Sequence, residues 1–120
     1  MQTYTPAQTQ KAEKEIKKAF LEQSQGKCPQ DYECVALRCL FYMPFSSNIP
    51  KGRRALWHEK KHHTKRPDLD NLIKLVCDGL NETAFKDDNI VCSISAEKLY
   101  SFEPRTEVIL KYIKKDLTDT

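Results

Sequence analysis

The 120-residue chain lacks the cysteine spacing of a disulfide framework or a zinc site. Its five cysteines are an odd number and include no C-x-x-C pair, which argues against both kinds of stabilised small domain. Four of them lie within apolar runs, where a free thiol behaves as a small hydrophobic side chain: Cys34, Cys39, Cys77 and Cys92. We therefore expect buried free thiols and a reducing, cytoplasmic environment.

Long apolar runs, internal repeats and low-complexity stretches are also absent. No run approaches the roughly 20 residues of a membrane span, and the polar N-terminus does not resemble a signal peptide. With 39% hydrophobic and 31% charged residues, the composition is that of an ordinary globular protein. Residues 1–120 suffice for one hydrophobic core but not for two, so we expect a single domain with no membrane partner.

Acidic residues are scarce between Lys51 and Arg66, a stretch called the basic segment below. It has seven basic residues against one acid, Glu59, a net charge of +6. The rest of the chain has thirteen basic and sixteen acidic residues, a net −3, so the chain's overall +3 arises from this segment. Such a patch predicts a polyanion partner, with a solvated loop as the simpler alternative. The candidate DNA contacts are Lys51, Arg53, Arg54, Lys60, Lys61, Lys65 and Arg66.

Hydrophobic periodicity predicts a layer of helices and a layer of strands. We expect helices over residues 6–25, with Thr5 as N-cap, over 51–61 and over 69–80. Strands are expected over 33–43, 90–100 and 106–113, the last two joined as a hairpin by a turn at 103–104. This order indicates a single small α+β domain in two layers.

The helix over 69–80 has the clearest pattern. One continuous apolar stripe runs along it, formed by Leu69, Leu72, Ile73, Val76, Cys77 and Leu80. Gly79 and Asn81 are expected to end it.

Two carboxylates, Asp68 and Asp70, stand at the start of this helix, directly after the basic segment. On an ideal helix they point roughly 200° apart. Pro67 favours an extended approach to the helix, and Asp68 is a natural N-cap with non-helical angles, so both carboxylates can lie over the helix end. The simpler alternatives are capping by Asp68 and a salt bridge from Asp70 to Lys74.

A second acidic pair, Asp87-Asp88, follows one helix length later. If a strand begins near Asn89, Asp88 shares the parity of the side chains that face the helix, whereas Asp87 points away. Asp88 is then the better third metal ligand, and Asp87 has a supporting role.

Three carboxylates without a cysteine or histidine ligand form a hard oxygen site, suited to Mg²⁺ or Mn²⁺. A water on such an ion can attack a phosphodiester. Lys74 follows Asp70 by one helical turn, where it can orient that water or offset charge on the phosphate.

Three motifs closely resemble the RusA family of Holliday-junction resolvases: residues 65–74 (KRPDLDNLIK), 78–81 (DGLN) and 85–91 (FKDDNIV). The likeness is strong over about residues 51–91, and residues 3–6 resemble the segment before the family's first helix. It implies a mixed β-sheet packed with helices. It also implies a homodimeric, Mg²⁺-dependent endonuclease, often encoded by prophages, that nicks four-way junction DNA symmetrically. The implied metal ligands are Asp68, Asp70 and Asp88, the catalytic lysine is Lys74, and Asn71 and Asp87 have supporting roles.

Family members usually begin with a strand and a loop before the first helix, whereas this chain starts almost at that helix. We therefore expect a sheet with an unpaired edge or a substitute for the strand. Three functions stay open. A metal-dependent junction endonuclease ranks first, and a junction-binding protein with weak or no cleavage ranks second. A phosphohydrolase acting on other substrates ranks third, because it leaves the basic segment unexplained.

Overall fold

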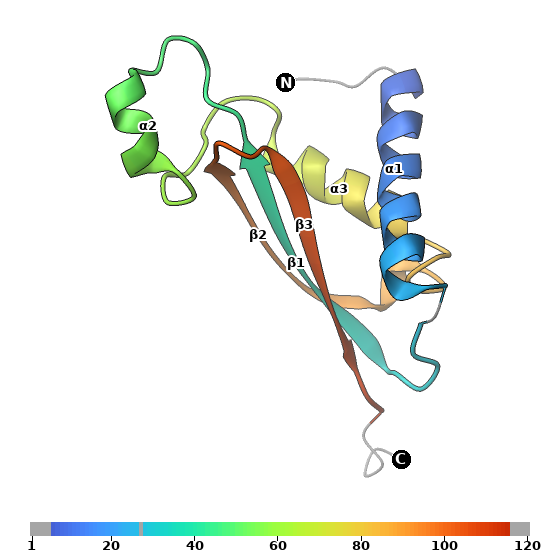
Figure 1. The fold of residues 1–120 in the computed structure, drawn as a ribbon. Coiled ribbons are helices and arrows are strands. Elements are labelled where there is room, and N and C mark those ends of the chain that lie inside the picture. Colours follow the sequence, from blue (N-terminus) through green and yellow to red (C-terminus); the bar gives the residue numbers. More distant parts are fainter. Residues whose placement is uncertain (1–5, 27, 116–120) are drawn as a thin grey trace.

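The computed structural model describes residues 6–26 and 28–115; Thr5 and residues 3–4 lie outside the described residues. Figure 1 shows the elements in chain order: α1 (Pro6–Ser24), β1 (Cys34–Met43), α2 (Lys51–Trp57), α3 (Leu69–Leu80), the 3₁₀ turn η1 (Asp88–Ile90), β2 (Val91–Tyr100) and β3 (Arg105–Ile113). A sheet packed with helices confirms the α+β prediction. None of the described helices is long and apolar enough to cross a membrane.

β1 is the central strand of a three-stranded mixed sheet. It pairs in parallel with β2 and antiparallel with β3, in the order β2-β1-β3. The predicted hairpin is therefore wrong, because β2 and β3 lie on opposite edges of β1. The connection at residues 101–104 reaches across β1, a span of about 10 Å. β1 occupies the centre because its inward side chains are at most 2% exposed: Val35, Leu37, Cys39 and Phe41.

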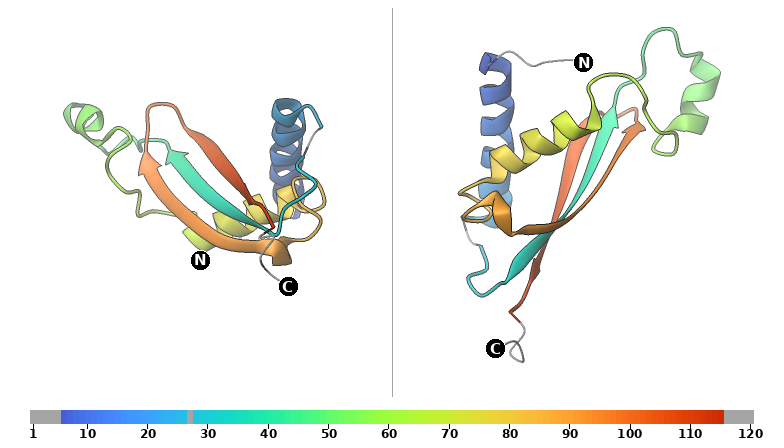
Figure 2. Two further views of the ribbon diagram at one scale, coloured as in Figure 1. Left: turned by 90° about the horizontal axis from the view of Figure 1, so that it is seen from below. Right: turned by 180° about the vertical axis from the view of Figure 1, so that it is seen from behind.

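α3 lies across one face of the sheet, and α1 packs against α3 beside β3 (Figure 2). The apolar stripe of α3 faces the core as predicted: Leu72, Val76 and Leu80 are buried, and the other three side chains are partly buried against them. A side chain of this size, moved from water to the core, contributes about 1.5–3 kcal/mol. The prediction that Gly79 helps to end this helix is wrong, because Gly79 lies within α3 and the C-cap is Asn81. A Cβ there would lie 2.9 Å from the Cβ of Ile16, so Gly79 permits the close approach of α1 and α3.

All five cysteines are free, as predicted, but their burial differs from the prediction. Cys39 is buried, whereas Cys92 is exposed. The register between β1 and β2 shifts beside Val35, so that Val91 pairs with Val35 and Ser93 with Ala36. Cys92 is the unpaired residue between them and loses the alternation expected of a regular strand.

Candidate active site and nucleic-acid interface

α2 carries the first part of the basic segment beyond the end of the sheet, away from α1 and α3 (Figure 1). None of its residues is buried. Arg54 is turned inward, because its Nε donates to the Ile49 carbonyl at 3.1 Å and its Nη2 to the Ser46 carbonyl at 3.3 Å. Lys51 and Arg53 are exposed. Arg54 thus holds the loop before α2, whereas Lys51 and Arg53 remain exposed candidates for the predicted polyanion contact.

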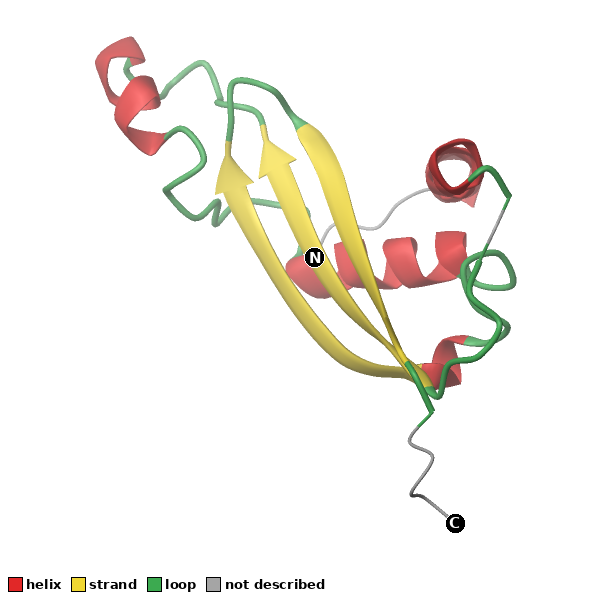
Figure 3. Cartoon of the chain, turned by 60° about the horizontal axis from the view of Figure 1, so that its bottom comes forward, coloured by secondary structure: helices red, strands yellow, loops and turns green. Residues whose placement is uncertain are grey.

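Residues 59–63 run antiparallel along the outer edge of β2, as the loop after α2 in Figure 3 indicates. The Glu59 amide donates to the Tyr100 carbonyl at 2.6 Å, and the Tyr100 amide donates to the Lys61 carbonyl at 3.1 Å. The His63 amide donates to the Lys98 carbonyl at 2.9 Å. The helix predicted over 51–61 therefore ends at Trp57. The residues after it substitute for a strand at this edge and lead into α3.

Tyr100, which is 6% exposed, is the aromatic anchor of this arrangement. Its ring stacks on Phe45 at 5.3 Å between centroids and contacts Trp57 at 5.5 Å and His63 at 4.9 Å. The Lys61 ammonium lies 5.0 Å from the Trp57 ring centroid, within cation–π range. Rings from the loop, from α2 and from β2 therefore fix the basic segment to the sheet.

Glu59, the acid of the basic segment, is paired inside the fold. Its Oε2 accepts from Arg105 Nη1 at 3.2 Å and from the Ser101 hydroxyl at 3.0 Å. Hydrogen bonds from Arg105, and then from Ser101, lower the pKa of Glu59. Because Arg105 comes from β3, it offsets the carboxylate without engaging a lysine or arginine of the basic segment.

His63 is 9% exposed, and its Nδ1 has no hydrogen-bond partner. Burial, together with the charges of Lys98 and Lys65, lowers the pKa of His63 from its ordinary value of 6.5. The folded protein thus favours the neutral ring. As the pH falls below 6.5, the histidine is protonated more in the unfolded chain than in the folded protein. We expect the free energy of unfolding to decrease as the pH falls below 6.5 toward the folded pKa.

His63→Phe keeps a ring against Tyr100 and is expected to flatten this pH dependence in urea unfolding measured between pH 7 and pH 5. His62→Phe is the matched control, because His62 is exposed and contacts Glu97 at the surface. An equal slope for wild type and His63→Phe would contradict a neutral His63.

The predicted acidic pair occupies the first turn of α3. Asp68 is the N-cap with extended angles (φ −68°, ψ 143°), as predicted, and its side chain makes no capping hydrogen bond. Asp70 is exposed, and its Oδ1 accepts from the Asn71 amide at 2.9 Å. Among the described residues no ion pair joins Asp70 to Lys74, so the two simple roles weighed for these acids are not observed.

Lys98 contacts this turn from β2 and was not singled out by sequence reasoning. Its Nζ donates to the Lys65 carbonyl at 2.6 Å and to the Pro67 carbonyl at 2.7 Å. Burial lowers the pKa of the Lys98 ammonium, and the Asp68 carboxylate opposes that shift. A sequence signal did exist, because Lys98 has the parity of Ala96, which packs against the core, within a predicted strand.

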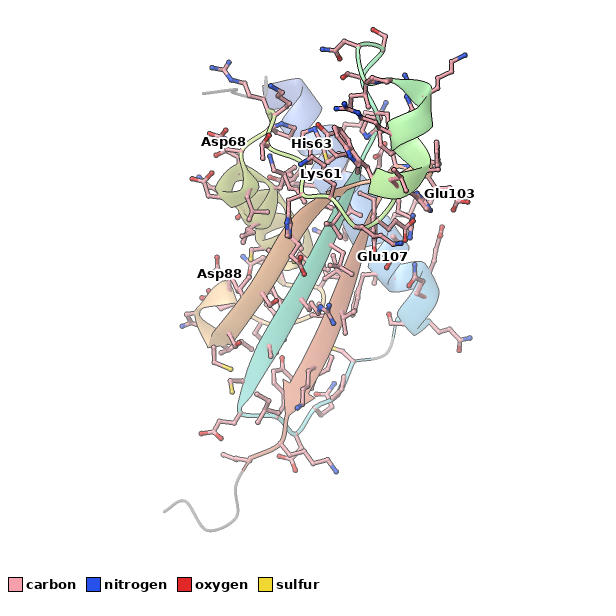
Figure 4. All side chains as sticks on the ribbon, turned by 90° about the vertical axis from the view of Figure 1, so that its left-hand side faces the viewer. Lys61, His63, Asp68, Asp88, Glu103 and Glu107 are labelled. Atoms are coloured by element: carbon pink, nitrogen blue, oxygen red, sulfur yellow. The ribbon has the colours of Figure 1, made fainter. Side chains whose placement is uncertain are left out.

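Asp88 lies at the opposite end of α3 from Asp68 (Figure 4). The 12 residues of α3 correspond to about 18 Å. A hydrogen bond with Asp87 raises the pKa of Asp88, and burial and the charges of Asp87 and Asp78 act in the same direction. The parity argument for Asp88 was wrong in its premise, because Asp88 belongs to η1 and β2 begins only at Val91.

The sequence model described as endodeoxyribonuclease RusA matches residues 1–111 of this chain. The chain belongs to the RusA endodeoxyribonuclease family. The uncharacterized protein YqaN of Bacillus subtilis (strain 168) is 32% identical over 82 residues, which cover 66% of this chain and 58% of YqaN. The chain thus matches little more than half the length of that relative. No significant match was found among solved structures.

The match to RusA includes every predicted site residue, but the fold does not gather all three carboxylates. Within the part of the chain that the structure describes, no group of three His, Cys, Asp or Glu side chains is placed to hold a metal ion. The chemistry of the donors still fits Mg²⁺, because all are carboxylate oxygens. One end of α3 supplies Asp68 and Asp70, and Mg²⁺ is commonly held by one or two carboxylates together with substrate phosphate and water.

Proposed function

We propose that this member of the RusA family is a Mg²⁺-dependent endonuclease that resolves four-way DNA junctions by paired nicks. The observation that carries the proposal is the continuity between the basic segment and the first turn of α3. Residues 59–63 are bonded to β2, and three residues after Lys65 the chain reaches Asp68. A DNA backbone held by the lysines therefore passes beside the acids.

The surface of the basic segment attracts the phosphates. Lys51, Arg53, Lys60 and Lys65 are exposed, and the carboxylate within the segment, Glu59, is already paired with Arg105. Contacts of this kind bind DNA backbone without reading its sequence. Recognition of a four-way junction then depends on where two such surfaces stand relative to each other.

Asp68 and Asp70 hold the metal in this proposal, with Asp88 as the third ligand. When bound, Mg²⁺ supplies a polarised phosphate and an activated water. Lys74 is exposed one turn after Asp70, and its ammonium offsets the charge that develops on the phosphate. Asn71 and Asp87 support the two ends of the site, Asp87 by accepting from the Asn89 amide at 3.2 Å.

A homodimer accounts for the separation of Asp88 from the other two acids. Residues 92–95 of β2 are exposed and uncharged, and Ile94 is 44% exposed. An edge of this kind is suited to pairing with another strand. Residues 59–63 cover this edge from Lys98 onward, so two copies that pair antiparallel about Ile94 meet over residues 91–97. The start of each β2 then lies next to the covered end of the other, near Asp68 of that copy. Each site then combines Asp68 and Asp70 of one copy with Asp88 of the other.

A synthetic four-way junction, incubated with the protein and Mg²⁺ beside linear duplex of the same sequence, tests the proposal. We expect symmetric nicks in the junction, little cleavage of the duplex and no cleavage in EDTA. Equal cleavage of both substrates would contradict junction resolution, and cleavage of neither would contradict a nuclease.

A junction-binding protein with weak or no cleavage is the second candidate. It is favoured by the position of Asp88, which leaves a single chain without three gathered carboxylates. Tight binding of the junction in EDTA, with no nicks at any Mg²⁺ or Mn²⁺ concentration, would support this candidate over the nuclease.

Replacing Arg53, Lys60 and Lys65 by alanine is expected to weaken junction binding and to reduce its salt dependence. With fewer phosphate contacts, the variant releases fewer counterions from DNA when it binds. The magnitude of the slope of log K against log salt should therefore decrease by about 1 for each residue replaced. The control replaces three exposed lysines elsewhere by alanine: Lys14, Lys17 and Lys111. Fluorescence anisotropy of a labelled junction measures the affinity and its salt dependence for both variants. An unchanged slope in the first variant would place the DNA on another surface.

A further inference from the structure

Lys98 is a charged residue on the side of β2 that faces the helices. In register it stands beside Phe41, which is 2% exposed, and Ala96 on the same side packs against the core. A partly buried ammonium is costly unless hydrogen bonds replace its water. The contacts that replace water at Lys98 therefore indicate what the residue does.

Those contacts converge on the three-residue stretch that precedes Asp68. The Lys98 ammonium donates to the carbonyls of Lys65 and Pro67, at 2.6 and 2.7 Å. The Lys98 carbonyl in turn accepts from the His63 amide at 2.9 Å. One residue of β2 thus holds the end of the basic segment by its main chain and the entry to α3 by its side chain.

The position of Asp68 depends on this hold. The Asp68 side chain makes no capping hydrogen bond, and its main chain is bonded to α3 through the Leu72 amide, which donates to the Asp68 carbonyl at 3.2 Å. Among the described ion pairs none joins Lys98 to Asp68, and the ammonium is engaged by backbone carbonyls instead. Lys98 therefore acts on Asp68 through the main chain and adds a positive charge nearby.

We infer that Lys98 is a positioning residue of the nuclease reaction, which keeps Asp68 in a fixed place relative to DNA bound on the basic segment. The inference rests on the proposed function. Displacing a reacting group by about 1 Å can cost about 100-fold in rate, so loss of this hold reduces turnover far more than DNA binding.

The test compares Lys98→Met, Lys98→Arg and the control Lys111→Met, which removes a lysine of β3 with an exposed side chain. Trypsin cleavage after Lys65, followed by mass spectrometry, reports the hold without any reference to activity. We expect Lys98→Met to accelerate this cleavage about tenfold, because two charge-assisted hydrogen bonds are lost. Lys98→Arg, which keeps charge and donors, should stay within about threefold of wild type.

The same proteins are then assayed for junction binding in EDTA and for nicking in Mg²⁺. Lys98→Met is expected to bind within about threefold of wild type but to turn over about 10- to 100-fold more slowly. Lys98→Arg should recover most of that rate, and Lys111→Met should behave as wild type throughout. If Lys98→Met does not fold, Lys98→Gln takes its place, since it removes the charge but keeps a polar side chain.

Two results would overturn the inference while leaving the nuclease intact: wild-type turnover in Lys98→Met despite a released loop, or no change in cleavage after Lys65. A wild-type protein that nicks no DNA with Mg²⁺ would instead overturn the proposed function. The proteolysis result would still show whether Lys98 holds the loop.

Discussion

Changing Asp68, Asp70 or Asp88 to asparagine is expected to reduce nicking of a four-way junction in Mg²⁺ below about one thousandth of the wild-type rate. Each change removes an anionic oxygen that the metal needs. Junction binding in EDTA should be retained or become tighter, because repulsion between the acids and the phosphates decreases. Nicks are counted on denaturing gels and binding by band shift, with Asp31→Asn in an exposed loop as the control.

Mixing two inactive variants tests how the acids are shared between copies. In the proposed dimer, Asp70→Asn combined with Asp88→Asn forms mixed dimers in which one of the two sites retains every acid. Single nicks are therefore expected to return on mixing, while each variant alone stays inactive. If native mass spectrometry shows mixed dimers and no nicking returns, each site belongs to one chain. If any one of the single variants Asp68→Asn, Asp70→Asn or Asp88→Asn nicks at the wild-type rate, the residue changed in it is not part of the site.

Lys74→Ala is expected to lower turnover by two or more orders of magnitude, on the scale of removing a stabiliser of transition-state charge. Stability should change little, because Lys74 is exposed and no described ion pair joins it to Asp70. Even a formed pair at this spacing contributes only about 0.3–0.5 kcal/mol. Single-turnover nicking and thermal melting measure the two effects.

Lys74→Arg is the matched variant, since it keeps the charge on a longer side chain and should retain more activity than Lys74→Ala. A large drop in melting temperature with turnover nearly intact would make Lys74 a structural residue instead. Equal turnover in Lys74→Ala and wild type would exclude it from the reaction.

Local patterns in the sequence were sufficient where the answer depends on neighbouring residues. The apolar stripe of α3 predicted its ends at Leu69 and Leu80, because spacing along a helix decides which side chains share a face. Asp68 was correctly expected at the N-cap, since aspartate is favoured at this position, where the backbone has non-helical angles. The charge imbalance located the basic segment, and the motifs around Asp68 and Asp88 pointed to the RusA family.

Strand pairing required the tertiary structure. Residues 90–100 and 106–113 follow each other closely, and a hairpin is the simplest prediction for two such strands. The sheet places β1 between them instead, because its inward side chains are the most completely buried of any strand. The register shift beside Val35 and the turn η1 then ended the alternation from which the positions of Cys92 and Asp88 had been predicted.

The composition of the proposed site follows from the sequence, which supplies carboxylates for a hard metal, lysines for phosphate and the order in which they occur. Its geometry was determined by contacts between residues far apart in the chain. Lys98 reaches the carbonyls before Asp68 from 31 residues away, and residues 59–63 reach the edge of β2. Asp88 stays at the far end of α3 because one rigid helix separates it from Asp68. The spacing of these residues along the chain does not predict the distances between them in the fold.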